Sequence, residues 1–162
     1  MIDEKDGEGF LTTLTEILEK KASQDEYVKF EQYLLQTLMK NHPDSIYFKN
    51  TKSQFTRINH ACAKKFNLNK HSEATGKTDF DFFSFEHADN AYKDEQHIIK
   101  TGEPIVAKEE KEVYPGLDET TVRWVTTTKL PLYDQNNEII GTFGISRDIT
   151  DYKKAESGTN RT

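Results

Sequence analysis

Three closely spaced carboxylates, Asp79, Asp81 and Glu86, are the side chains of this sequence best suited to general acid–base chemistry. Such chemistry needs two carboxylates in one site, with environments that set their pKa values apart. Here the acidic residues alternate with phenylalanines in the run Asp-Phe-Asp-Phe-Phe. That alternation is more typical of capped helical turns than of a catalytic pair, so we expect no acid–base site.

Metal-binding and nucleophilic side chains are equally scattered. A designed metal site needs ligands at close spacing, and no His-x-x-x-His pair occurs among the five histidines, His42, His60, His71, His87 and His97. The single cysteine, Cys62, excludes an intrachain disulfide and a cysteine-based zinc site. Residues 141–144 read Gly-Thr-Phe-Gly and lack the lysine of a phosphate loop. We therefore expect no enzyme activity from this chain; a kinase or cyclase would have to lie in an effector region outside it.

The composition narrows the classes of partner. The net charge is −6 with 31% charged residues, which argues against nucleic-acid binding through a basic surface. No apolar run approaches the roughly 20 residues that span a membrane, and the acidic N-terminus lacks the apolar segment of a signal peptide. A cytoplasmic location is expected. Ten phenylalanines and seven tyrosines supply much of the area available for a core.

Strand patterns occupy both ends of the second, longer part of the chain. Residues 123–132 and 139–150 are β-branched and aromatic runs joined by the polar turn 133–137, which predicts a long antiparallel hairpin. Residues 104–113, 45–49 and 54–59 read as three further strands, with a turn at 114–119. Helices are predicted at 61–66, with Asn59 as its cap, and from Ser84 to Lys100. The fold class is α+β: a five-stranded antiparallel sheet with helices on one face.

The N-terminal part is helical in pattern. Residues 1–9 are expected to be loose, and residues 10–39 contain neither proline nor glycine. Leucines recur there at helical spacing, with a polar interruption between Lys20 and Glu26. One long helix and two helices broken near residues 22–24 are both compatible with this pattern. A narrow apolar stripe favours pairing with another helix, for example from a second chain; folding back on the same domain is the alternative.

Five short motifs occur in the second part of the chain, at 41–46 (Asn-His-Pro-Asp-Ser-Ile), 57–66 (an Asn-x-Ala step followed by Phe66), 76–81, 99–104 and 148–150 (Asp-Ile-Thr). Their order resembles that of the PAS sensory domain of bacterial sensor kinases, cyclic-di-GMP enzymes and chemoreceptors. The resemblance covers residues 33–156. It divides the chain into an N-terminal helical extension (1–32), a PAS domain (33–150) and the start of an output helix with its tail (151–162).

The resemblance implies a role in sensing or dimerisation. Haem-binding relatives use a histidine on the long helix, at a register that falls here on Ala91; His87 and His97 lie off that register, so haem is not expected. Light-sensing relatives need a cysteine after the Gly-x step, and residues 76–81 contain none, so a covalent flavin adduct is not expected either. Cys62 is interpreted as a small buried hydrophobe. The identity of any cofactor stays open.

An apolar pocket with few polar groups is predicted for a small metabolite or a ring compound. Its candidate lining residues are Ile46, Phe48, Phe55, Phe66, Phe80, Tyr92, Ile98, Trp124, Thr126 and Phe143. The alternative is that these rings fill the core without a ligand.

The ends of the domain are predicted to pass the signal on. Asp148 and Thr150 are placed to cap the output helix, and Asp148 is expected to pair with Arg123 or Lys129 on the neighbouring strand. A homodimer through the N-terminal helix is expected, with an effector domain or partner protein downstream. Two functions therefore stand: a ligand-sensing signalling module, and a ligand-free dimerisation or docking module. A two-component system is the expected setting.

Overall fold

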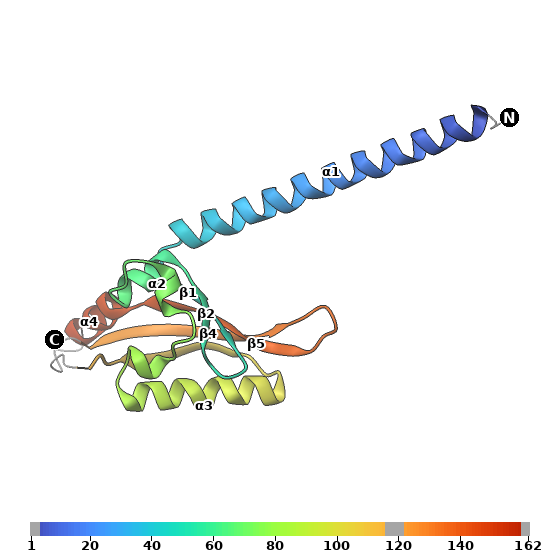
Figure 1. The fold of residues 1–162 in the computed structure, drawn as a ribbon. Helices are drawn as coiled ribbons and strands as arrows, with labels where there is room; N and C mark the ends of the chain where they lie inside the picture. Colours follow the sequence, from blue (N-terminus) through green and yellow to red (C-terminus); the bar gives the residue numbers. More distant parts are fainter. Residues whose placement is uncertain (1–3, 116–121, 160–162) are drawn as a thin grey trace. The chain divides into compact units, whose positions relative to one another are not determined.

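The computed structural model describes residues 4–115 and 122–159. The chain divides into two compact units, residues 1–38 and residues 39–162. The second unit is built on one antiparallel sheet of five strands in the order β2-β1-β5-β4-β3 (Figure 1). Its strands are β1 (Ser45–Asn50), β2 (Phe55–Ile58), β3 (Ile105–Glu112), β4 (Arg123–Tyr133) and β5 (Ile139–Asp148).

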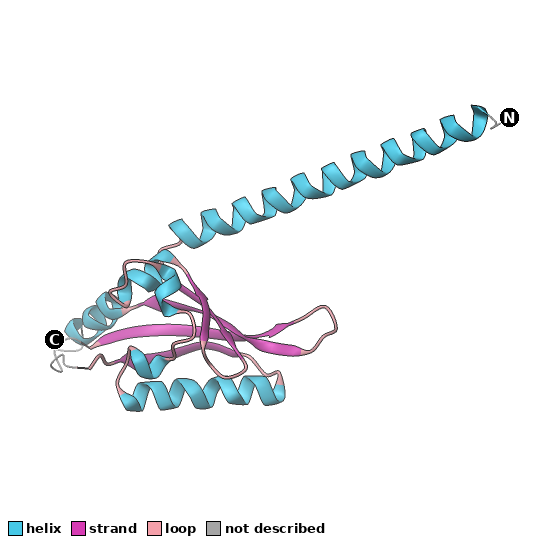
Figure 2. Cartoon of the chain, viewed as in Figure 1, coloured by secondary structure: helices cyan, strands magenta, loops and turns pink. Residues whose placement is uncertain are grey.

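Helices and short helical turns connect β2 to β3 and close the chain. They are α2 (His60–Lys65), η1 (His71–Ala74), η2 (Asp79–Asp81), α3 (Phe85–Thr101) and α4 (Thr150–Thr159) (Figure 2). The predicted α+β class, with a five-stranded antiparallel sheet, is confirmed. None of the helices in the described part of the chain combines the length and apolar character needed to cross a membrane.

Helix α1 (Glu4–Asn41) runs without a break; it forms the described part of the first unit, and its last three residues, 39–41, belong to the second. The expectation of a loose N-terminus over residues 1–9 is wrong from Glu4 onward, and the alternative of two helices is excluded. The polar stretch between Lys20 and Glu26 contains lysine, alanine, glutamine and glutamate, which are good helix formers. Polarity therefore interrupts the apolar stripe of the helix without interrupting the helix itself.

Helix α3 begins after the predicted cap Ser84 and ends at Thr101, one residue beyond the predicted end. The Ser84 hydroxyl accepts a hydrogen bond from the backbone N–H of His87, and Gly102 closes the other end with φ +74°. Its buried face is Ala88, Ala91, Glu95 and Ile98, a spacing that places all four on one side of the helix. Two alanines allow the helix to approach the sheet closely, and a glutamate lies among them.

The C-terminal helix α4 extends further than predicted. It continues through Ser157 and Gly158 to Thr159, where the sequence predicted a break. The predicted turn at 114–119 lies largely outside the described residues. The predicted polar turn between β4 and β5 contains Asn137 in a left-handed conformation, with φ +61°.

Candidate functional site

The inner face of the sheet, defined as the face that carries Tyr47, Lys49, Thr127, Lys129 and Ser146, is polar. Side chains alternate between the two faces along each strand, and these five residues are all buried. Buried inner residues alternate with half-buried or exposed ones over residues 124–130 of β4 and residues 142–147 of β5. The interior of this domain therefore contains ammonium and hydroxyl groups as well as aromatic rings.

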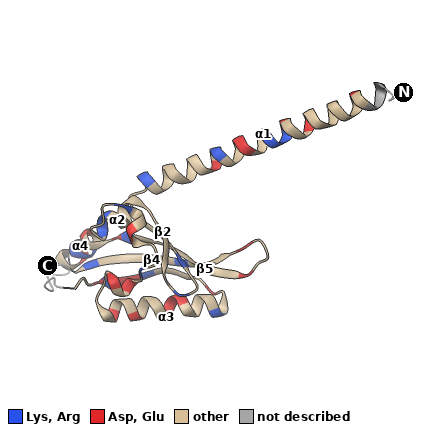
Figure 3. Cartoon of the chain, viewed as in Figure 1, with Lys and Arg blue, Asp and Glu red and all other residues tan. Residues whose placement is uncertain are grey.

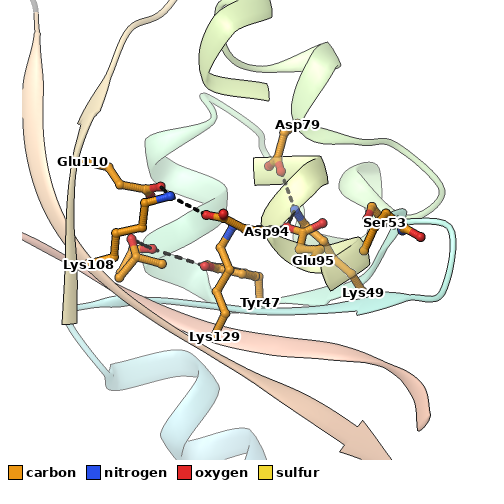
Figure 4. A network of polar contacts seen from close by, with 12 residues as sticks. Tyr47, Lys49, Ser53, Asp79, Asp94, Glu95, Lys108, Glu110 and Lys129 are labelled. Atoms are coloured by element: carbon orange, nitrogen blue, oxygen red, sulfur yellow. Dashed lines mark hydrogen bonds and ion pairs between the residues drawn. The ribbon is translucent and has the colours of Figure 1, made fainter. Parts of the chain in front are cut away.

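Two lysines and two carboxylates form a buried ionic network on this face (Figure 4). The Lys49 ammonium donates to Asp79 and, at 2.5 Å, to Glu95 Oε1. The Lys129 ammonium lies 3.4 Å from the same Oε1 atom. Lys49 is 2% exposed and Glu95 is fully buried. Glu95 thus links α3 to β1 and β4, two strands separated by β5.

The network keeps its lysines charged. Burial alone lowers the pKa of Lys49, but the carboxylates of Asp79 and Glu95 outweigh it and raise that pKa above its ordinary value. Burial also lowers the pKa of Lys129, and the charges of Glu95 and Asp79 again outweigh burial and raise that pKa. Both groups are therefore ammonium ions at neutral pH, in a region from which water is largely excluded.

A chain of hydroxyls continues the polar surface beside the network. Thr127 Oγ1 and Ser146 Oγ are 3.0 Å apart, and the Tyr47 hydroxyl is 3.4 Å from Ser146 Oγ. Burial raises the pKa of Tyr47 above its ordinary value, so its phenol stays protonated. The strands thus present hydrogen-bond donors and acceptors at fixed positions.

A small cavity of about 30 Å³, here called the inner-face cavity, lies between these strands and the helical segments. Phe55, Phe66, Phe83, Cys62 and Ala91 form its apolar wall. Its polar lining is larger than the sequence predicted and consists of Ser45, Tyr47, Lys49, Lys65, Asp79, His87, Glu110, Glu112, Thr127, Lys129 and Ser146. Its volume corresponds to about two water molecules.

Of the ten residues predicted to line a pocket, Phe55 and Phe66 line the inner-face cavity. Five others, from β1, β4 and β5, lie on the opposite face of the sheet because they alternate with inner-face residues: Ile46, Phe48, Trp124, Thr126 and Phe143. The rings of Phe48 and Phe143 stack on each other there, with centroids 5.7 Å apart. The sequence-based prediction selected the strand positions that carry large aromatic rings. Because neighbouring positions of a strand face opposite sides of the sheet, a shift of one position assigns every side chain to the wrong face.

The remaining three predicted pocket residues lie on or near α3. Ile98 is fully buried on the inner side of the helix but is not part of the cavity lining. Phe80 and Tyr92 are both more than two-fifths exposed. Phe80 contacts the exposed ring of Phe85, with centroids 5.6 Å apart.

Cys62, His87 and His97, which were considered for flavin or haem, are placed as follows. Burial raises the pKa of the Cys62 thiol to about 12, so the cysteine is protonated and unreactive. His87 lines the cavity beside Ala91, with Nδ1 3.0 Å from the Lys111 carbonyl oxygen. His97 pairs with Glu103 at 3.3 Å. Within residues 4–115 and 122–159, no group of three or more histidine, cysteine or carboxylate side chains is placed to hold a metal ion.

Asp148 and Thr150 connect the sheet to the output helix, but not with the predicted partners. Asp148 Oδ1 accepts a hydrogen bond from the Thr150 backbone N–H at 2.9 Å. The Thr150 hydroxyl accepts one from the Trp124 backbone N–H at 3.0 Å, so α4 is fastened to β4. Lys129 belongs to the inner ionic network, which corrects its pairing with Asp148. Arg123 lies over the Tyr114 ring at 5.6 Å, and acts on Asp148 only through its charge.

Replacing Asp148 with alanine is expected to speed up hydrogen exchange of the first-turn amides of α4, because the Thr150 N–H loses its acceptor. The loss of such a cap costs about 1 kcal/mol. Burial opposes the shift, yet the hydrogen bonds from Thr150 and the charge of Arg123 lower the pKa of Asp148 below its ordinary value of 3.8. A lowered carboxyl pKa stabilises the folded state above that ordinary value, and the stabilisation is lost as pH falls below it.

The matched variant for this prediction is Asp148→Asn, which keeps the oxygen acceptor but cannot titrate. It should retain slow exchange in α4 at neutral pH and lose the acid-dependent increase. Unchanged exchange in Asp148→Ala would contradict a capping role.

The most buried charges of the site, Lys49 and Glu95, were not identified from the sequence. Their signals were present in the pattern. Glu95 falls on the apolar face of α3 at the spacing of Ala88, Ala91 and Ile98, and Lys49 ends the apolar run of β1. A charge at a position whose period predicts burial indicates a partner of opposite charge in the interior.

The region that carries this site is similar to known proteins. A family model described as "PAS fold" matches residues 39–154. The methanogenesis regulatory histidine kinase FilI of Methanothrix harundinacea (strain 6Ac) is 28% identical over 143 residues, which cover 88% of this chain and 16% of that protein. The Vibrio cholerae VqmA dimer solved without its target DNA has a TM-score of 0.64 and 26% identity, covering 76% of this chain and 52% of VqmA. VqmA bound to DPO has a TM-score of 0.62 and 25% identity, covering 74% and 57%.

Proposed function

The chain belongs to the PAS fold family and is homologous to a region of a regulatory histidine kinase, and from this premise we propose that it is a sensory module that binds a small molecule in the inner-face cavity. The signal of ligand binding would be transmitted to α4 and from there to an effector domain or a partner protein. The chain spans 16% of the length of the curated relative. We expect no catalytic activity from the chain itself.

The observation that supports this proposal is the polar lining of the cavity. Burying a charge costs free energy that a hydrophobic side chain of the same size would not incur. Lys49, Asp79 and Lys129 of this lining are nevertheless buried, as is their partner Glu95, which lies outside the lining. Concave sites that combine an apolar wall with a few fixed polar groups are typical of small-molecule recognition. VqmA, whose similarity is given above, has been solved with the ligand DPO.

The route from the cavity to the output helix is short. Ser146 lines the cavity, and Asp148 lies two residues further along β5, on the same face of that strand. Asp148 then holds the first turn of α4 through Thr150. Lys153 of α4 also pairs with Glu109 of β3 at 2.7 Å. A ligand that moves Ser146 would thereby alter the contacts that hold α4 against the sheet.

A native mass spectrum of the purified protein, compared with its denatured mass, tests the proposal. We expect a discrete excess in the native mass per chain, whose value identifies the class of ligand. A native mass that shows no bound ligand, even after incubation of the protein with an extract of small metabolites, would contradict ligand sensing.

That negative result would favour a second function, a ligand-free dimerisation or docking module. The specific observation in its favour is the small volume of the cavity, about 30 Å³, whereas pockets for drug-sized ligands have several hundred Å³. In this reading Lys49 itself fills the pocket: its ammonium lies 4.6 Å from the centroid of the Phe55 ring.

We further propose that α1 pairs with the α1 helix of a second copy. The helix has 38 residues, and a solitary helix of this kind gains little stability from its own hydrogen bonds. Charged residues of both signs occur along it (Figure 3). Its exposed apolar side chains extend along its length: Phe10, Leu11, Leu14, Ile17, Leu18, Tyr27, Val28, Phe30, Tyr33, Leu34, Leu35 and Leu38. Apolar exposure on this scale marks an interaction surface.

Substituting Leu34→Lys is expected to weaken the dimer about a thousand-fold, because each copy loses about 2 kcal/mol of burial. Sedimentation velocity over a range of concentrations measures the change. Gln24→Lys, in the polar part of the same helix, is the matched control and should leave the association unchanged. A wild-type protein that sediments as a monomer at all concentrations would refute the pairing.

A further inference from the structure

The inner-face cavity adjoins a second hollow, a surface groove of about 390 Å³ between the first half of α3 and the edge strand β3. It is called the α3–β3 groove here. Glu86, Asn90 and Glu109 line this groove and are exposed, so the groove is open to solvent. His87 and Glu110 line both the groove and the inner-face cavity. These two side chains therefore form the wall between the cavity and the solvent-filled groove.

The seam between α3 and β3 is polar on the side of the strand. Lys108 lies opposite the inner-face residue Thr127 in the β3–β4 ladder, so Lys108, Glu110 and Glu112 point inward. All three of these residues are charged. β3 is also an edge strand, and its pairing with β4 is irregular between residues 105 and 108. Segments with few buried apolar contacts open locally at a low cost in free energy.

Two side-chain contacts hold this seam closed along its length. The imidazole Nδ1 of His87 lies 3.0 Å from the Lys111 carbonyl oxygen, which can only accept, so Nδ1 carries the proton and donates it. Further along the helix, the Lys108 ammonium donates to Asp94 at 2.6 Å (Figure 4). The Lys108 side chain is 41% exposed, and an exposed ion pair contributes little stability. The wall of the cavity is therefore held mainly by the hydrogen bond of His87.

The His87 side chain can leave this position while the start of α3 stays in place. The Ser84 hydroxyl accepts a hydrogen bond from the His87 backbone N–H, and the Ser84 N–H donates to the Val113 carbonyl oxygen at 2.8 Å. These backbone contacts fasten the helix start to the end of β3 without involving the imidazole ring. The ring itself packs on Phe83, with centroids 4.5 Å apart. A rotation of the ring thus breaks one hydrogen bond and one ring contact.

The opposite side of the cavity is closed by aromatic packing. The rings of Phe66 and Phe82 are stacked with centroids 4.1 Å apart, and Phe55 contacts both of them edge-on. Phe55 is 2% exposed. Separating these rings would return a large apolar area to water, which is unfavourable in proportion to that area. Opening at the polar α3–β3 seam is therefore the less costly route.

We propose that the inner-face cavity opens into the α3–β3 groove, with the side chain of His87 as its gate. In the closed state the imidazole is bound to the Lys111 carbonyl oxygen. In the open state the ring turns into the groove and Glu110 moves outward with its partner Lys108. A small molecule can then enter the domain without unfolding it. This inference rests on the proposed ligand-binding function and names the route of entry to that site.

The single cysteine of the chain reports on the opening. Cys62 lines the inner-face cavity and is 1% exposed, so a thiol reagent reaches it only when the cavity is open. The test treats the whole 162-residue chain with methyl methanethiosulfonate, a small neutral thiol reagent, and follows the intact mass with time. We expect His87→Ala to raise the labelling rate about ten-fold, because the closed seam loses its main hydrogen bond. His97→Ala is the matched control: its side chain is 54% exposed on the same helix, and it should label at the wild-type rate.

The dependence of the labelling rate on urea separates opening of the seam from unfolding. Opening the seam exposes little surface, so low concentrations of urea should leave the rate nearly unchanged, whereas unfolding responds with the full denaturant slope. The urea-unfolded protein provides the rate for a freely accessible thiol. A wild-type rate that rises as steeply with urea as the unfolding equilibrium would overturn the gate, even where the His87 variant fails to fold. Equal rates in His87→Ala and His97→Ala would overturn it as well.

The outcomes also separate the gate from the proposed function. Labelling that is insensitive to urea and accelerated in His87→Ala would support the gate even where the native mass shows no bound ligand, and that native mass would contradict ligand sensing. A bound ligand in the native mass, together with equal labelling rates in both variants, would overturn the gate alone.

Discussion

Replacing Glu95 with alanine is expected to lower the free energy of unfolding by about 3–5 kcal/mol. The substitution removes the carboxylate that both buried lysines share. Lys49 keeps Asp79, but Lys129 is left as a buried ammonium without a hydrogen-bond acceptor in the described part of the chain. A urea titration followed by the fluorescence of Trp124, the single tryptophan, measures the change.

Glu103→Ala is the control for this prediction, because Glu103 is a largely exposed carboxylate near the end of α3. A surface change of this kind should stay within about 0.5 kcal/mol. A double variant, Glu95→Leu with Lys129→Met, should recover part of the loss, since apolar side chains of similar volume can replace a buried ion pair. Equal effects of Glu95→Ala and Glu103→Ala would show that the network contributes no stability.

Gly141→Ala is expected to cost about 3 kcal/mol or more, at the upper end of the range for overpacking. Gly141 pairs with Asn50 across the β1–β5 ladder. A Cβ atom at this position would lie 2.0 Å from the Lys49 carbonyl oxygen and 3.2 Å from the Asn50 Cα. Both are backbone atoms, so the two strands would have to separate where Lys49 enters the ionic network.

The same urea titration measures this effect, and Gly158→Ala is its control. Gly158 lies in α4 with no atom within 4 Å of an added Cβ, and alanine is favoured over glycine in a helix by up to about 1 kcal/mol. The control should therefore be neutral or slightly stabilising. A Gly141→Ala protein as stable as the control would mean that β1 and β5 pair differently in solution.

The elements of this domain were predictable because their determinants are local. Asn59 accepts a hydrogen bond from the Cys62 N–H at the start of α2, Ser84 caps α3, and Gly102 ends it. Each of these residues acts within one turn of its own position, so a short stretch of sequence contains the whole cause. The hairpin of β4 and β5 was likewise predictable from two runs of strand-forming residues and the polar turn between them.

The site was predicted less well because its determinants are distant in sequence. Lys49, Asp79, Glu95 and Lys129 come from four different elements, and a lysine read alone is expected at the surface. The choice of face in β1, β4 and β5 depends on which side the carboxylates of η2 and α3 occupy. The positions of the large aromatic rings alone had favoured the opposite face of the sheet as the inner one.

The sequence by itself therefore determined the fold class, the order of the strands and helices, the boundaries of most of them and the resemblance to the PAS family. These follow from propensities, caps and periodicity, all of which act over a few residues. Only the tertiary structure decided which face of the sheet turns inward and which charges meet there. That choice is set by the cost of burying an unpaired charge, which becomes low only when the partner arrives from another part of the chain.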